Sequence, residues 1–141
     1  MFKLINNHDV VNKILFFVLF CSKNSISSVI WIPHEIDTVS KLVKPDTLNK
    51  LIIEPISIVD KRYTNHIIRY LSSDGATIID KNGMLQYFGS IVDMKNLEIE
   101  GITGTGESAA QVLCSNGIAF KISQDGTIKL FLENSEEAII I

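Results

Sequence analysis

The sequence has no excess of positive charge. It contains 13 lysine and arginine residues against 16 aspartate and glutamate residues, and its formal net charge at pH 7 is -3. Extended, non-specific binding of nucleic acid needs many lysine and arginine contacts to phosphates. We therefore expect no nucleic-acid partner, although a few backbone amides suffice to hold a small phosphorylated ligand.

Cysteine and histidine are also scarce. Cys21 and Cys114 are too few for a disulfide framework, and neither stands in a metal-ligand spacing, so we expect buried, reduced thiols. The three histidines, His8, His34 and His66, share no spacing. No pairing of a serine or cysteine with a histidine indicates nucleophilic catalysis.

A long hydrophobic run is absent as well. The apolar run from Ile14 to Cys21 is too short for a bilayer, which takes about 20 apolar residues. Phe20 is a poor residue before a lipidated cysteine, and no small-residue cleavage site follows. We expect instead a core helix capped by Asn7 or Asp9, and hence a cytoplasmic protein with no membrane partner. Its apolar face comprises Val10, Val11, Ile14, Leu15, Val18 and Leu19, and Phe16, Phe17 and Phe20 widen it enough to predict cover on more than one side.

The chain of 141 residues, 46% hydrophobic and 21% charged, suits one globular domain. We place that domain at residues 1–133 and a C-terminal tail at 134–141. The tail is acidic and then apolar. An added edge strand, a frayed end and a cut in a longer protein are all compatible with it.

Short strands and helices alternate along the first half. The β-branched run Val29–Ile32, before Pro33, predicts a buried strand. Thr64 has the character of an N-cap for a helix through Leu71, with its apolar residues facing inward. The remaining segments are a helical or irregular stretch at 36–42, a new start at Pro45, and a short strand at 56–58.

The second half is mostly β. Hairpins are predicted over Ala76–Phe88 and Ile118–Phe131, because Asn82-Gly83 and Asp125-Gly126 supply the residues that tight turns require. A helix at 107–114 lies between them and is closed by Asn116-Gly117. Helices that alternate with strands, followed by hairpins, favour an α/β domain built on a mixed sheet.

Two segments could carry chemistry. Gly104-Thr105-Gly106 precedes a helix, so it is either a phosphate site or an ordinary glycine-rich cap. Glu107, in the first helical turn, would repel a phosphate unless a metal lay between them. Asp74 either holds a divalent metal together with phosphate oxygens or bonds its own turn. Asp125 has the position of a turn residue, and Ser123 either faces a pocket or ends a strand.

The order and spacing of these motifs carry a family resemblance. Asp74-Gly75-Ala76 follows a helix and opens a hairpin, Gly104-Thr105-Gly106 comes about thirty residues later, and Ser123-Gln124-Asp125 lies in the second hairpin. This set resembles the catalytic core of the diadenylate cyclases, which join two ATP molecules into a cyclic dinucleotide. The resemblance covers nearly the whole chain.

The resemblance implies a mixed, twisted β-sheet surrounded by helices. It also implies ATP or a cyclic dinucleotide over the Asp-Gly-Ala turn with Mg or Mn, and a face-to-face homodimer. By position, Asp74 matches the aspartate of the family that binds metal on the ribose side. The implied nucleotide-binding residues are Asp74, Gly75, Ala76, Gly104, Thr105, Gly106, Ser108 and Ser123, and the implied metal ligands are Asp74 and Glu107.

The departures from the family bear on mechanism. Gly106-Glu107-Ser108 stands where those enzymes carry Arg-His-Arg, although charge develops on phosphates during the reaction and needs positive groups. Gln124 also replaces a carboxylate. We therefore predict a nucleotide-binding sensor or regulatory domain in cyclic dinucleotide signalling, without cyclase activity, that acts on a separate effector protein. The alternatives are an active nucleotidyltransferase with an altered phosphate loop and a structural, oligomerising module.

Overall fold

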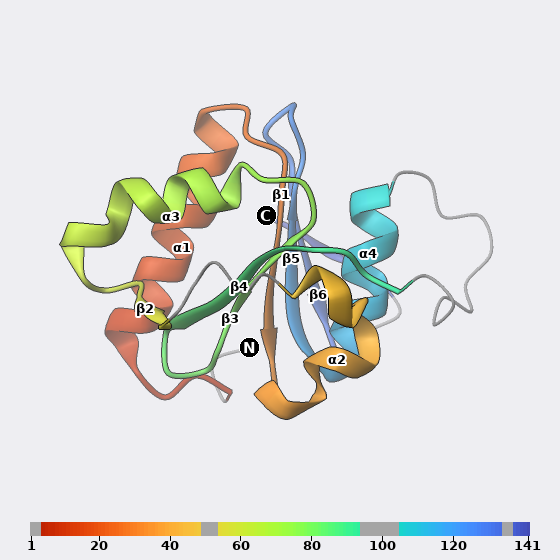
Figure 1. Cartoon of the computed structure of the whole chain (residues 1–141). Helices are drawn as coiled ribbons and strands as arrows, with labels where there is room; N and C mark the ends of the chain where they lie inside the picture. Colours follow the sequence, from red (N-terminus) through yellow and green to blue (C-terminus); the bar gives the residue numbers. More distant parts are fainter. Residues whose placement is uncertain (1–3, 49–53, 94–104, 134–136) are drawn as a thin grey trace.

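Seven strands form one mixed sheet with helices on both faces, in a computed structural model that describes residues 4–48, 54–93, 105–133 and 137–141 (Figure 1). The strand order is β2-β4-β3-β1-β5-β6-β7. The β1–β3 pair is parallel and the other pairs of neighbours are antiparallel. The predicted α/β class with a mixed sheet is confirmed.

The bounds of the strands and helices are as follows. The strands are β1 Ser28–Pro33, β2 Ile56–Ser57, β3 Ala76–Ile79, β4 Met84–Ser90, β5 Gly117–Ile122, β6 Ile128–Leu132 and β7 Ile139–Ile140. The helices are α1 His8–Lys23, α2 Val39–Leu42, α3 Thr64–Leu71 and α4 Thr105–Leu113. Short 3-10 turns occupy Ile36–Thr38, Pro45–Thr47, Lys61–Tyr63 and Cys114–Asn116.

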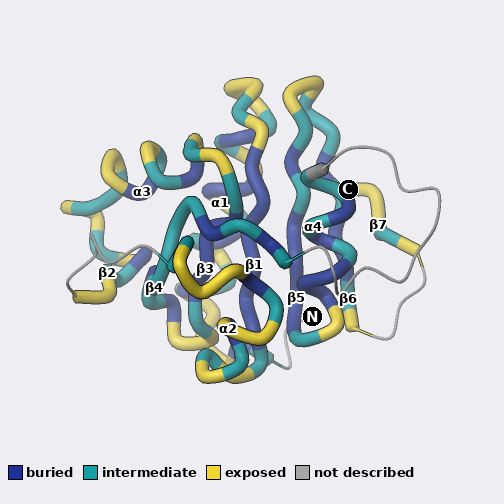
Figure 2. Tube along the Cα trace, turned by 45° about the vertical axis from the view of Figure 1, so that its right-hand side comes forward, coloured by how far each residue is buried: buried dark blue, intermediate teal, exposed yellow. Residues whose placement is uncertain are grey.

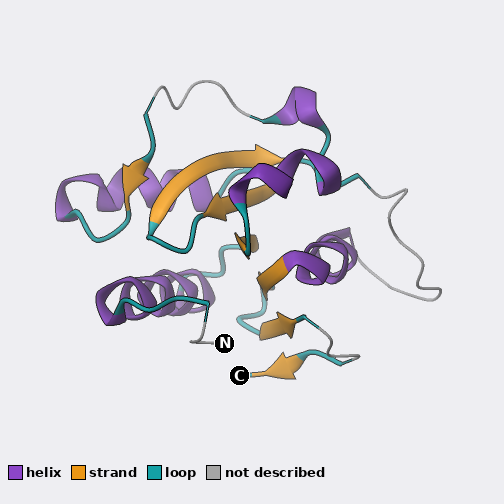
Figure 3. Ribbon diagram, turned by 90° about the horizontal axis from the view of Figure 1, so that it is seen from below, coloured by secondary structure: helices purple, strands orange, loops and turns teal. Residues whose placement is uncertain are grey.

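The sheet separates two hydrophobic cores, and seen from below the helices flank the strands on both sides (Figure 3). All residues of β1 are buried, and Figure 2 shows this strand dark blue between exposed turns. Because successive side chains point to opposite faces, Ile30 and Ile32 pack in the core of α1 and α3. Val29 and Trp31 pack in the core of α2 and α4. The predicted buried strand is therefore confirmed.

Helix α1 is capped as predicted but is covered on one side only. The Asn7 side chain accepts hydrogen bonds from the backbone N–H groups of Asp9 and Val10. Phe17 is fully buried, whereas Phe16 is 44% exposed and Leu19 is 51% exposed. The expectation of cover on more than one side, and of an inward Leu19, was wrong because among the described elements only the sheet side meets the core. No helix in the described part of the chain is long and apolar enough to cross a membrane.

Helix α3 begins differently from the prediction. A 3-10 turn at Lys61–Tyr63 precedes it, and the Asp60 side chain accepts the backbone N–H of Arg62. Thr64 already has helical φ and ψ of -53° and -47° and caps nothing with its side chain. Ile67 and Leu71 are buried as predicted. The turn ahead of the helix therefore replaces the threonine cap.

Both hairpins form where they were predicted. In the first turn the Asp80 side chain accepts the N–H groups of Asn82 and Met84, and only Gly83 adopts a positive φ. In the second turn Asp125 accepts the N–H of Thr127, as a turn aspartate does. The helix between them begins at Thr105 and passes through a 3-10 turn before Gly117.

Part of the tail adds an edge strand to the sheet. Strand β7 pairs antiparallel with β6, and Ile139 lies opposite Leu130. Both residues of β7 are exposed.

Candidate functional site

A cleft of about 540 Å³ lies at one end of the sheet. Its walls are the start of β1, the turn between α3 and β3, the end of β4, the first turns of α4, and β5. The predicted residues Asp74, Gly75, Ala76 and Gly106 all line it. Residues that are more than 30 positions apart in the sequence therefore meet in one cavity.

Strand register explains the floor of the cleft. Ala76 lies opposite Ser90 on one side and Val29 on the other, and Val29 lies opposite Lys121. Paired residues on adjacent strands point to the same face, and Val29 and Ala76 belong to the core that α4 covers. The row Ser90, Ala76, Val29, Lys121 therefore crosses the sheet beneath the start of α4.

Two glycines shape the wall that carries Asp74. Gly75 has a φ of +98°, and a Cβ built on it would lie 2.6 Å from the carbonyl carbon of Gly89. Gly89 itself has a φ of +63°. The turn therefore packs backbone to backbone on β4, next to an irregularity in the β3–β4 register. This close packing leaves the exposed Asp74 at the rim of the cleft.

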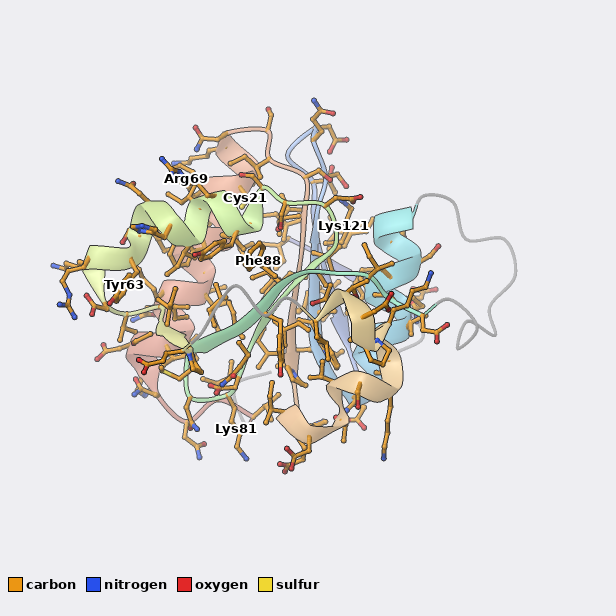
Figure 4. All side chains as sticks on the ribbon, in the orientation of Figure 1. Cys21, Tyr63, Arg69, Lys81, Phe88 and Lys121 are labelled. Atoms are coloured by element: carbon orange, nitrogen blue, oxygen red, sulfur yellow. The ribbon has the colours of Figure 1, made fainter. Side chains whose placement is uncertain are left out.

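The cleft also contains a lysine that the sequence analysis did not single out. The Lys121 ammonium donates to Ser27 Oγ at 2.7 Å and to the carbonyl oxygen of Ile122 at 2.9 Å. Burial lowers its pKa, and the nearby Glu107 carboxylate opposes that shift. Figure 4 shows Lys121 between the sheet and α4. Strict alternation along β5, which puts Ala119 and Lys121 on one face, is the signal that could have found it.

The other predicted residues lie elsewhere. Glu107 accepts a hydrogen bond from Lys129 Nζ at 2.9 Å, and Ser108 is buried in α4. Ser123 stands in the β5–β6 turn, where its N–H donates to the Thr127 carbonyl oxygen. None of these three is among the described residues that line the cleft.

The phosphate-loop prediction is only partly described. Thr105 begins α4, and its side chain is not described, while Gly104 lies outside the described residues. Gly106 sits in the first turn of this helix and lines the cleft. The start of a helix presents free N–H groups, so Gly106 brings that end of α4 to the cavity.

Two serine hydroxyls at the cleft have no hydrogen-bond partner among the described residues. Ser28 is 4% exposed and Ser90 is fully buried, and both line the cleft. A buried polar group without a partner costs roughly 1–3 kcal/mol. Ser90 is paired with Ala76 on the face of the cleft, whereas Ser28 is paired with Ile122 of the opposite core, so a polar ligand would offer the Ser90 hydroxyl a partner that the described residues do not provide.

The carboxylates fit a metal only in part. The described residues contain no group of three or more histidine, cysteine, aspartate or glutamate side chains that could hold one. Asp74 is the sole carboxylate among the described lining residues. Mg²⁺ commonly takes one or two carboxylates and completes its shell with water and phosphate oxygens. Asp74 fits that arrangement, whereas the Glu107 carboxylate already bonds Lys129.

A larger hollow of about 670 Å³ lies beside the N-terminus of α1 and the β3–β4 turn. Its charged lining residues are Asp9 and Lys81, with His8 nearby. It contains none of the predicted site residues and neither of the unpartnered serines. The smaller cleft is therefore the better candidate site.

Comparison with known proteins identifies the fold. No protein-family model and no curated protein sequence matches the chain. Among solved structures, a hypothetical membrane spanning protein from Bacillus cereus matches 93% of the chain at 16% identity, with a TM-score of 0.68. DacA from Staphylococcus aureus, solved as a double mutant, matches 92% of the chain at 16% identity, with a TM-score of 0.59.

The chain spans 62% of the Bacillus cereus structure and 85% of the DacA structure. DacA is a diadenylate cyclase, so the chain has the diadenylate cyclase fold. At this identity the likeness concerns the fold alone.

Proposed function

We propose that the chain is a nucleotide-binding sensor or regulatory domain of diadenylate cyclase-like fold, without cyclase activity. The observation that carries this proposal is the cleft. It combines the Asp74-Gly75-Ala76 turn, the first turn of α4 and the Lys121 ammonium with the Ser90 hydroxyl, which has no described partner. A few convergent polar groups in a concave site are typical of small-molecule binding.

The same cleft gives little support for chemistry on a triphosphate. Joining two nucleotides requires positive groups where charge develops on the phosphates. The first turn of α4 supplies Gly106, Glu107 and Ser108 instead, and Glu107 is negative. Lys121 is the one cation among the described lining residues. One lysine suffices to bind an anionic group, but a single cation is a weak clamp for a triphosphate and its leaving group.

Asp74 is the proposed metal ligand. It would hold Mg²⁺ or Mn²⁺ together with phosphate oxygens of the bound nucleotide, and the metal would neutralise part of the phosphate charge.

Ligand-induced thermal stabilisation tests the sensor proposal. The melting temperature is measured with ATP and with cyclic diadenylate, each with Mg²⁺, in the wild type, Asp74→Ala and Asp125→Ala. Asp125 is an exposed turn residue outside the described lining, so its variant controls for loss of a surface carboxylate. A nucleotide that binds the folded state alone stabilises it by mass action. We expect the gain to be lost in Asp74→Ala and kept in Asp125→Ala. The proposal fails if no nucleotide raises the melting temperature.

An active nucleotidyltransferase is the second candidate, and the exposed Asp74 at the rim favours it. Incubation with ATP and Mn²⁺, followed by mass spectrometry, separates the two. A linear or cyclic dinucleotide that Asp74→Ala does not form would establish an enzyme. Unchanged ATP with a raised melting temperature would leave the sensor, which we propose acts on a second copy or a separate effector protein. Unchanged ATP without stabilisation would leave a structural module.

A further inference from the structure

We propose that Lys121 binds the anionic group of the cleft ligand, which is a phosphate of the nucleotide. Gly106 has no side chain, and the space that this leaves is occupied by the Lys121 side chain. This inference rests on the proposed function and adds the residue that recognises the ligand charge. Lys121 lies on β5 in the row that forms the cleft floor, next to the first turn of α4.

The packing of Gly106 against Lys121 supports this assignment. A Cβ built on Gly106 would lie 2.5 Å from Lys121 Cε, 2.9 Å from Nζ and 3.0 Å from Cδ. Gly106 lies within a helix and does not have the positive φ that favours glycine. Glycine destabilises a helix relative to alanine, so the backbone conformation does not explain a glycine at position 106. The space that the glycine leaves for the Lys121 side chain explains it.

Among the described residues no carboxylate forms an ion pair with the Lys121 ammonium, although the Glu107 carboxylate is close enough to oppose the lowering of the ammonium pKa by burial. An ammonium has three N–H donors, and the two acceptors bonded to Nζ, Ser27 Oγ and the Ile122 carbonyl oxygen, are both neutral. The nearest candidate anion, Glu107, bonds Lys129 instead. Half-buried charges are usually paired, and a phosphate oxygen would supply the missing anion.

A buried serine hydroxyl lies in the same row of residues as Lys121. Ser90 lies at the other end of the same row, its hydroxyl has no partner among the described residues, and it is fully buried. Ser28 is paired with Ile122 of the opposite core, so its side chain belongs to the other face of the sheet. The row spans three strand spacings of about 4.8 Å each, so the Ser90 hydroxyl would donate to another part of the ligand than the anionic group that Lys121 binds.

Isothermal titration tests the proposal with three probes: ATP, inorganic tripolyphosphate and adenosine. The variants are Lys121→Gln, Gly106→Ala and, as a control, Lys81→Gln. Lys81 is exposed in the turn between β3 and β4 and does not line the cleft, so its variant removes one positive charge without releasing Glu107 from Lys129. Far-UV circular dichroism verifies that each variant is folded.

We expect Lys121→Gln to weaken binding of ATP and tripolyphosphate by roughly 10- to 100-fold, as loss of a charge-assisted hydrogen bond does. Adenosine affinity should not change. Gly106→Ala should give a smaller loss for the two anions while stabilising the helix, and Lys81→Gln should leave all three affinities within about twofold.

Three results would overturn the assignment. They are unchanged ATP affinity in Lys121→Gln, an equal loss for adenosine and ATP, and a loss in Lys81→Gln as large as that in Lys121→Gln. In each case ATP still binds the wild type, so the proposed function survives. If neither ATP nor tripolyphosphate binds the wild type, the assignment fails together with nucleotide binding.

Discussion

Replacing Gly75 by alanine should destabilise the fold more than the same replacement at Gly89 or Gly126, two other glycines with a positive φ. The added Cβ would meet three backbone atoms: the carbonyl carbon of Gly89 at 2.6 Å, its oxygen at 2.9 Å and the amide nitrogen of Ser90 at 2.9 Å. Backbone atoms of a paired strand cannot rotate away as a side-chain end can. Strand β4 must therefore shift relative to the turn that carries Asp74.

The size of the effect has two parts. A residue with a side chain at positive φ costs roughly 1–2 kcal/mol. Overpacking that displaces backbone typically costs about 1–3 kcal/mol more. We therefore expect the free energy of unfolding to fall by about 2–5 kcal/mol in Gly75→Ala. Without the contact between the added Cβ and the backbone of β4, only the cost of the positive φ would remain.

Urea unfolding followed by the fluorescence of Trp31 measures this difference. Trp31 is the only tryptophan, and it is fully buried in β1. Gly89→Ala and Gly126→Ala are the controls. These glycines have φ of +63° and +92°, but an added Cβ would lie no closer than 3.4 Å and 3.3 Å to the nearest atom, the carbonyl oxygens of Asp74 and Ser22. These two variants should lose only about 1–2 kcal/mol. If Gly75→Ala costs no more than the controls, the backbone contact does not constrain the turn.

Two further predictions concern α1. Phe17→Ala should lower the free energy of unfolding by about 3–5 kcal/mol, because Phe17 is fully buried. Phe16→Ala, on the exposed face, should lower it far less. Urea unfolding of both variants measures the difference, and equal losses would contradict the one-sided packing. Burial raises the pKa of Cys21 from 9.0 to about 11, so the unfolded chain releases this proton first and stability should fall as the pH rises between those values. The decline should be smaller in Cys21→Ala, and an identical pH dependence would refute the shift.

The sequence predicted secondary structure correctly where the structure depends on neighbouring residues. The cap at Asn7, the buried strand before Pro33 and the two hairpins with glycine at the turn all appear in the structure. Each depends on a few consecutive residues whose φ preferences or hydrogen-bonding groups act locally. The prediction of a Thr64 cap was wrong because of another local interaction. The side chain of Asp60, four residues earlier, accepts the backbone N–H of Arg62 and forms a turn ahead of the helix.

The candidate site was less accessible to sequence analysis. Asp74, Gly75, Ala76 and Gly106 meet in the cleft as expected. Glu107 was expected to be a metal ligand, which stays a prediction; the structure adds that its carboxylate accepts a hydrogen bond from Lys129 of β6, 22 positions away. Pairings of this kind depend on strand register and on how a helix lies across a sheet.

The sequence by itself determined the order of elements, the α/β class and the glycine-containing turns, because hydrophobic periodicity and backbone preferences are properties of neighbouring residues. Only the tertiary structure decided which charges share a cavity. Lys121 lies in an otherwise apolar strand, and its environment is created by β1 on one side and by a glycine of α4 above it. Contacts between residues far apart in the chain exist only once the sheet has formed, so they leave no local pattern to read.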